Sequence, residues 1–63
     1  MLDPLLQPSE DRRREIFAAL VAAQDRGVSV HQSKQDTAAM FGVTWQTVEQ
    51  IAREGMDNDW PPL

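Results

Sequence analysis

The sequence contains no cysteine and only one histidine, and both absences exclude kinds of site. Without cysteine the chain cannot form a disulfide or a thiolate metal site. His31 has no carboxylates at ligand spacing around it, so we expect no metal ion and no cofactor. Stability must come from packed helices or from association of chains, because so short a domain buries only about 60% of its unfolded surface.

Long apolar runs are also missing. No segment approaches the roughly 20 apolar residues that cross a membrane, so we expect no membrane association. Near the N-terminus the arginines follow the leucines, which is the reverse of the order in a signal peptide. We therefore expect a cytoplasmic protein.

The residue patterns of catalytic sites are absent as well. The sequence has no Ser/His/Asp arrangement, no paired carboxylates in a cleft-forming fold and no glycine-rich phosphate loop. A chain of this length is also too small to enclose a substrate. We therefore do not expect an enzyme.

Positive charge is scarce. Six Lys and Arg stand against ten Asp and Glu, which gives a net charge of −4. Three of the acids lie in the terminal segments, so residues 9–56 hold seven acids and six bases, a net charge of −1. The total charge therefore neither indicates nor forbids binding to nucleic acid. The 41% apolar and 25% charged content is typical of a folded domain.

Apolar residues recur at helical intervals in three segments. The first predicted helix spans about 10–26, between a suitable N-cap at Ser9 and a suitable terminating residue at Gly27. One face of it carries apolar residues at intervals of three and four, Ile16, Leu20 and Ala23, and they are flanked by Phe17, Ala19 and Val21.

The start of the second helix has two candidates. Ser33 can cap a helix over 34–41, with an acid three residues later and with residues 28–32, including His31, as a connector. Ser29 can instead cap an earlier start, with a glutamine three residues later completing a capping box. We prefer the start at Ser33.

The third predicted helix spans 45–54, with Thr44 as its cap and Gly55 as its end. Residues 1–8 and 56–63 contain prolines and no helical period, so we expect extended segments there. The predicted fold class is all-α, with three helices within residues 9–55 and extended tails.

The junction of the second and third helices has a specific residue pattern. Two helices that cross steeply at a tight turn need a small residue at the crossing, a turn residue able to adopt a left-handed conformation, and apolar residues on both sides. The sequence supplies them in order: Ala38, Phe41, Gly42, Val43, Val48 and Ile51. In this pattern residues 33–54, about a third of the chain, resemble the helix-turn-helix DNA-binding proteins, which include transcriptional regulators.

The resemblance implies a helix-turn-helix domain whose helix 45–54 lies in the major groove of double-stranded DNA. The residues implied to contact base edges are Trp45, Gln46, Thr47, Glu49 and Gln50. Those implied to contact phosphates are Lys34, Thr44 and Arg53. Glutamine amides can bond adenine, and the methyl group of threonine can touch a thymine methyl. The implied function is a small transcriptional regulator.

The implied reading helix departs from the common pattern, because it has one base, Arg53, and two acids, Glu49 and Glu54. Few bases mean weak binding by a single chain. We therefore expect a homodimer or a larger assembly. The arginines at 12–14 can either add phosphate contacts or pair with neighbouring acids.

The acidic balance, Trp45 and the apolar tails support a second hypothesis, a protein-interaction module on the same fold. Trp45 can cover the turn, contact thymine methyls or sugars, or bury itself in a partner protein. The tail Trp60–Leu63 can fold back over the core, contact a second copy or dock a partner. Under this hypothesis Trp45 and the apolar tails bind a protein partner.

Overall fold

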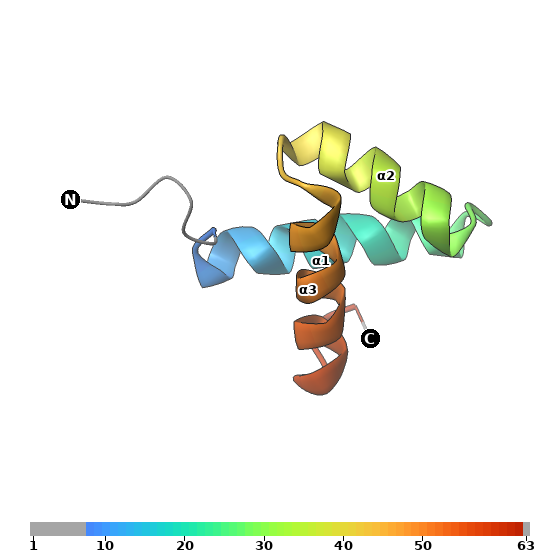
Figure 1. The fold of residues 1–63 in the computed structure, drawn as a ribbon. Coiled ribbons are helices and arrows are strands. Elements are labelled where there is room, and N and C mark those ends of the chain that lie inside the picture. Colours follow the sequence, from blue (N-terminus) through green and yellow to red (C-terminus); the bar gives the residue numbers. More distant parts are fainter. Residues whose placement is uncertain (1–7, 63) are drawn as a thin grey trace.

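The computed structural model describes residues 8–62 and consists of three α-helices. The helices are α1 (Glu10–Asp25), α2 (Val30–Phe41) and α3 (Trp45–Asp57). α1 and α2 lie side by side, and α3 crosses them steeply (Figure 1). The described residues contain no strand, which confirms the predicted all-α, three-helix fold class. The predicted extended segment before residue 8 lies outside the described residues.

Each helix begins after a hydroxyl residue whose side chain accepts a hydrogen bond from a backbone N–H of the first turn. These N-caps are Ser9 for α1, Ser29 for α2 and Thr44 for α3, at N···O distances of 3.2, 3.1 and 3.1 Å. The caps of α1 and α3 are those that the sequence predicts. The cap of α2 is the earlier of its two candidates.

The preferred start of the second helix at Ser33 is therefore wrong, and residues 30–32 are helix and not connector. Ser33 is fully buried inside α2. Its hydroxyl donates to the carbonyl oxygen of Val30 at 2.7 Å and accepts from the Gln24 side-chain amide at 3.1 Å. This contact with α1 uses the hydroxyl that a cap would need.

The turn between α2 and α3 has three residues, 42–44. Gly42 adopts the left-handed conformation, with φ 68° and ψ 33°, which glycine reaches at little cost. The N–H of Val43 then donates to the carbonyl oxygen of Ala38 at 3.0 Å and closes the end of α2. The turn thus sets the steep angle at which α3 leaves α2.

The predicted end of the third helix at Gly55 is also wrong, because α3 continues to Asp57. A Cβ built at Gly55 would overlap the ring of Phe17 on α1. Glycine at this position therefore lets α3 approach α1 closely, and it does not end the helix. The helix ends at Asn58, and Asp59 follows with a positive φ of 52°.

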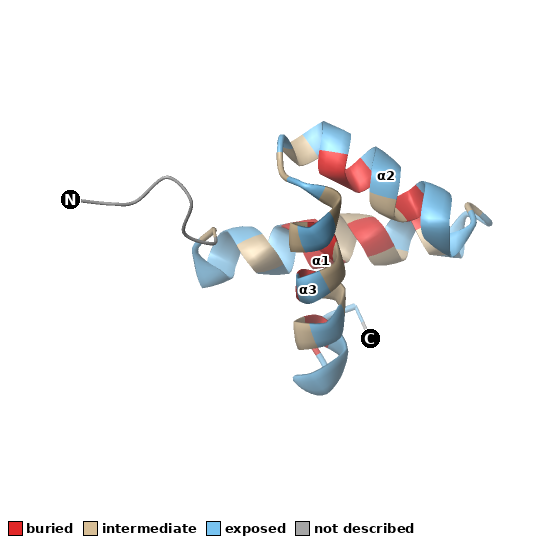
Figure 2. Cartoon of the chain, viewed as in Figure 1, coloured by how far each residue is buried: buried red, intermediate tan, exposed pale blue. Residues whose placement is uncertain are grey.

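The core lies where the three helices face one another (Figure 2). Its buried members are Ile16, Phe17, Leu20, Ala38, Val48, Ile51 and Trp60. Trp60 follows α3 and meets Phe17 edge to face, with ring centroids 6.1 Å apart. Of the three alternatives for the C-terminal tail, the structure shows the first, because Trp60 folds back into the core and the segment 58–62 turns instead of extending.

Candidate nucleic-acid interface

α3 has a buried side and an exposed polar side. Val48, Ile51 and Gly55 face the core. Gln46, Gln50 and Arg53 are exposed, and their spacing of four and three residues places them on one face of the helix. The two amides offer donors and acceptors and Arg53 offers a positive charge, so this face can bond bases and phosphates.

The two threonines at the start of α3 are bonded to each other. Thr44 Oγ1 accepts from the backbone N–H of Thr47 at 3.1 Å and donates to Thr47 Oγ1 at 2.9 Å. Thr44 is exposed and Thr47 is half-buried. Their hydroxyls therefore fix the first turn of α3, and Thr44 remains the more accessible of the two.

Trp45, the first residue of α3, lies back against α2. Its ring is tilted against that of His31, with centroids 6.0 Å apart, and the Lys34 ammonium lies 5.4 Å from its centroid. Its indole Nε1 is buried and has no hydrogen-bond partner among the described residues. Beside it lies a shallow hollow of about 480 Å³, lined by His31, Gln35, Ala38 and Trp45. Trp45 therefore covers the junction of α2 and α3.

Lys34 and Glu49 meet across α2 and α3. The Lys34 Nζ lies 3.8 Å from Glu49 Oε2, and the two side chains are 17% and 42% exposed. Both residues are implied DNA contacts in the sequence analysis, one for phosphate and one for a base. The structure brings their charged groups together beside Trp45, so each is the ion-pair partner of the other.

The arginines at 12–14 all have local or interhelical partners. Arg12 pairs with Glu15 at 3.0 Å, and Arg14 pairs with Glu10 at 2.8 Å. Arg12 also lies over the ring of Phe41, and Arg14 over that of Trp60. The run therefore pairs with neighbouring acids, which is one of its two expected roles.

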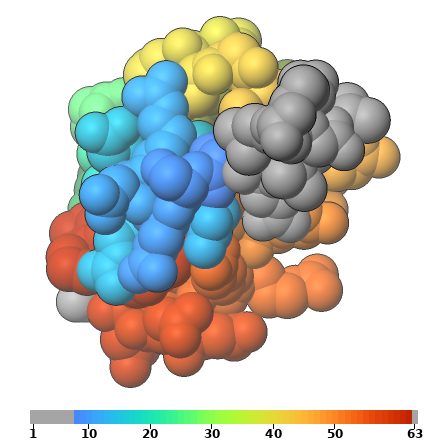
Figure 3. All heavy atoms as spheres, turned by 90° about the vertical axis from the view of Figure 1, so that its left-hand side faces the viewer, coloured from blue at the N-terminus to red at the C-terminus, as the bar shows by residue number. Residues whose placement is uncertain are grey.

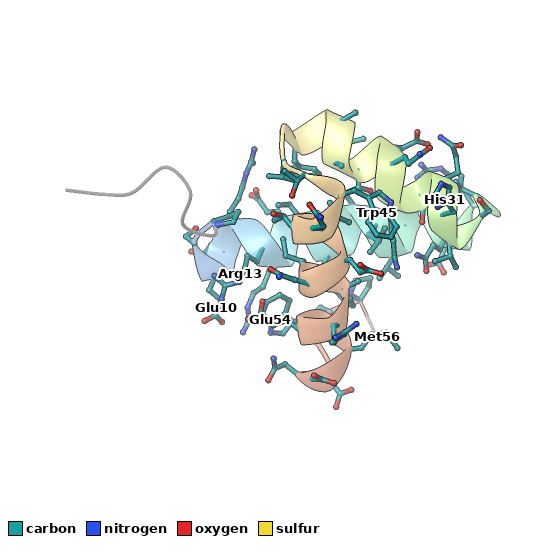
Figure 4. The ribbon with its side chains drawn as sticks, viewed as in Figure 1. Glu10, Arg13, His31, Trp45, Glu54 and Met56 are labelled. Atoms are coloured by element: carbon teal, nitrogen blue, oxygen red, sulfur yellow. The ribbon has the colours of Figure 1, made fainter. Side chains whose placement is uncertain are left out.

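Arg13 joins the start of α1 to the end of α3. Its Nε and Nη2 donate to the two carboxylate oxygens of Glu54 at 2.8 and 3.0 Å, and its Nη1 donates to the carbonyl oxygen of Pro8. The hydrogen bond to Glu54 raises the pKa of Arg13 above its ordinary value. The start of α1 (blue) lies directly against the end of α3 (red) in Figure 3. Figure 4 shows this pair on the opposite side of α3 from Trp45 and His31.

The ion pairs leave little free positive charge. All six bases lie in the described part of the chain, and four of them pair with carboxylates. Within residues 8–62, no such pair involves Arg26 or Arg53. Arg26 lies at the end of α1, so Arg53 is the unpaired base on the polar face of α3.

Compared with protein-family models, with curated proteins and with solved structures, the chain matches none of them. No helix among the described residues is long and apolar enough to cross a membrane. The same residues contain no group of three or more His, Asp or Glu side chains placed to hold a metal ion.

Sequence reasoning missed the contacts that join residues distant along the chain. It places His31 in a connector, yet His31 lies in the first turn of α2 against Trp45. It also gives no sign that Lys34 would pair with Glu49. A helix capped by Ser29 places His31 one turn before Lys34 and Gln35. This earlier cap was therefore the feature of the sequence that indicated their shared side of α2.

Proposed function

We propose that this chain is a small helix-turn-helix protein that binds double-stranded DNA in the cytoplasm and regulates transcription. The observation that carries the proposal is the exposed face of α3, where Gln46, Gln50 and Arg53 line up directly after a tight turn. In this arrangement α3 enters the major groove and its amides bond base edges. Arg53, Thr44 and a released Lys34 contact phosphates.

The distribution of charge supports action by two chains. Arg53 is unpaired, and Lys34 is held by a weak ion pair. The two charged phosphate contacts per chain, Lys34 and Arg53, predict that log K falls with log salt at a slope of about −2 for a monomer and about −4 for a dimer. The shallow slope expected for a single chain corresponds to weak binding. A homodimer has twice as many phosphate contacts, although each chain keeps the same lysine and arginine residues.

The proposal is tested by titrating the protein into random-sequence duplex at two salt concentrations while the mass of the complex is measured. We expect binding at low salt and a slope near one of the two values above. Arg53→Ala should weaken binding to every duplex alike and reduce the slope by about 1 for each bound chain. Gln46→Ala and Gln50→Ala should instead reduce the preference among sequences.

The result that contradicts the proposal is the absence of binding to any duplex at low salt and high protein concentration. Ala39→Ser is a suitable control, because Ala39 is exposed on α2 and is not among the implied DNA contacts. Its affinity should equal that of the unmodified chain.

A protein-interaction module is the second candidate, and one observation favours it. Between the helices lies a largely apolar hollow of about 450 Å³, bordered by Val30 and Met56, which are 58% and 65% exposed. Trp60 no longer supports this candidate, because it is buried in the core. If Met56→Lys abolishes a protein complex and leaves duplex binding unchanged, the hollow is the docking site. If Trp45→Ala also abolishes that complex, the contact extends along α3.

A further inference from the structure

Lys34 is the only lysine of the chain. Two contacts hold it beside the exposed face of α3 that carries Gln46, Gln50 and Arg53. Its Nζ lies 3.8 Å from Glu49 Oε2 and 5.4 Å from the centroid of the Trp45 ring. Its side chain is only 17% exposed. The aliphatic part of the Lys34 side chain is therefore packed between α2 and α3. The position of its ammonium group depends on whether the Glu49 carboxylate stays close to it.

The contact between Lys34 and Glu49 is weak. Arg13 and Glu54 form two hydrogen bonds at 2.8 and 3.0 Å, whereas the Lys34–Glu49 distance is 3.8 Å, beyond hydrogen-bonding range. The Glu49 side chain is 42% exposed to solvent. Pairs of this kind contribute little to stability and are readily exchanged for another partner.

A phosphate group can replace Glu49 as the partner of Lys34. The aromatic face of Trp45 keeps the ammonium at the first turn of α3 even when Glu49 moves away. That turn is the part of the helix that approaches the DNA in the proposed function. The Glu49 carboxylate has the same sign as a phosphate, so it opposes this exchange in two ways: it occupies the lysine and it repels the backbone.

We propose that Glu49 restrains sequence-independent binding to DNA by competing with phosphate for Lys34. The inference rests on the proposed function and adds to it a regulating residue on the same face. In the unbound protein Glu49 neutralises one of the two bases available to phosphate, Lys34 and Arg53. Binding to a duplex therefore requires that Lys34 leave Glu49.

The test compares Glu49→Gln with Glu10→Gln in titrations of random-sequence duplex at two salt concentrations. The two changes remove the same charge from a paired glutamate, but Glu10 pairs with Arg14 on the other side of α3 (Figure 4). We expect Glu49→Gln to bind about twofold to threefold more tightly than the unmodified chain, with the same slope, because Lys34 and Arg53 contact phosphate in both complexes. Glu10→Gln should differ from the unmodified chain by less than about 1.5-fold.

The double variant Lys34→Ala/Glu49→Gln separates competition for the lysine from simple repulsion. We expect most of the gain in affinity to be lost when the double variant is compared with Lys34→Ala alone, because Glu49 then has no lysine to pair with. The inference is overturned if Glu49→Gln binds no more tightly than Glu10→Gln, or if the double variant keeps the gain. If the unmodified chain binds no duplex at all, the proposed function fails and the inference fails with it. Circular dichroism of each variant verifies that the three helices are retained.

Discussion

The two ends of α3 are attached to the rest of the molecule by different kinds of contact. At the C-terminal end, Glu54 forms a two-pronged bond with Arg13, Gly55 lies against Phe17, and Trp60 is 4% exposed. The N-terminal end rests on the half-buried Trp45 and on an ion pair whose atoms are 3.8 Å apart. One end is closely packed, and the other is only loosely held.

This difference separates stability from binding along a single helix. The C-terminal contacts fix the direction of α3 on α1 and bury apolar surface. The N-terminal contacts are weaker, because the Trp45 indole N–H is buried without a partner in the described chain and Glu49 is 42% exposed. The N-terminal contacts should therefore contribute less to the free energy of unfolding than the C-terminal ones.

Removing each tryptophan in turn should produce the largest difference between the two ends of α3. Trp60→Ala should lower the free energy of unfolding by about 3–5 kcal/mol, because it empties a core position. Trp45→Ala should cost about 1 kcal/mol or less, because that ring is half-buried and its N–H is unpaired. Urea denaturation followed by circular dichroism measures both. Equal losses for the two variants would contradict the difference between the ends.

Gly55→Ala tests the close approach of α3 to α1. Alanine favours helix by up to about 1 kcal/mol over glycine, so propensity alone predicts stabilisation. The overlap with Phe17 predicts instead a loss of about 1–3 kcal/mol, measured by the same denaturation. Adding Phe17→Leu, which shortens the obstructing side chain, should make the combined loss smaller than the sum of the two single losses. A stabilised Gly55→Ala would show that α3 is not closely packed there.

Double-mutant cycles compare the two ion pairs of α3 directly. The Arg13–Glu54 pair should show a coupling free energy of about 1 kcal/mol, since it is a two-pronged bond between charged groups. The Lys34–Glu49 pair should show about 0.5 kcal/mol, because its atoms are 3.8 Å apart and the Glu49 side chain is 42% exposed. Alanine at each position and at both, followed by denaturation, gives the two values. If the coupling free energy of Lys34–Glu49 exceeded that of Arg13–Glu54, the N-terminal end of α3 would be the more firmly attached of the two.

Comparably small effects are expected at the two residues with positive φ on either side of α3. Asp59, with φ 52°, pays a conformational cost that glycine avoids, so Asp59→Gly should stabilise the fold by about 0.5 kcal/mol. Gly42, with φ 68°, already has the suitable residue, so Gly42→Ala should destabilise it by about 1 kcal/mol. Thermal denaturation of both variants measures the changes, and the same sign for both would contradict this explanation.

Local patterns in the sequence were sufficient to predict three helices. Ser9 and Thr44 lie where caps are needed, and Gly42 lies where a left-handed residue is needed. These features depend only on residues close together along the chain. The spacing of Ile16, Leu20 and Ala23 likewise predicts the buried side of α1.

Features that depend on distant residues were not predictable in the same way. Ser29 and Ser33 are equally good caps locally, and the contact of Ser33 with Gln24 on α1 decides between them. Glycine at 55 has the local character of a helix end, and only the position of Phe17 shows its packing role. In the candidate site, exposed Gln46, Gln50 and Arg53 follow from helical spacing. The partners of Lys34 and Arg13 do not, because they come from another helix.

An NMR titration of the nitrogen-15-labelled protein with random-sequence duplex at low salt tests whether DNA contacts the N-terminal part of α3 and leaves its C-terminal end unchanged. The indole N–H signals of Trp45 and Trp60 report on the two ends separately. We predict that the Trp45 indole and the backbone amides of Gln46, Gln50 and Arg53 shift on addition of DNA, while the Trp60 indole and the amides of residues 54–60 stay in place. Larger shifts at the Trp60 end, or no shifts at a large excess of duplex, would contradict the assignment of the loosely held end to DNA.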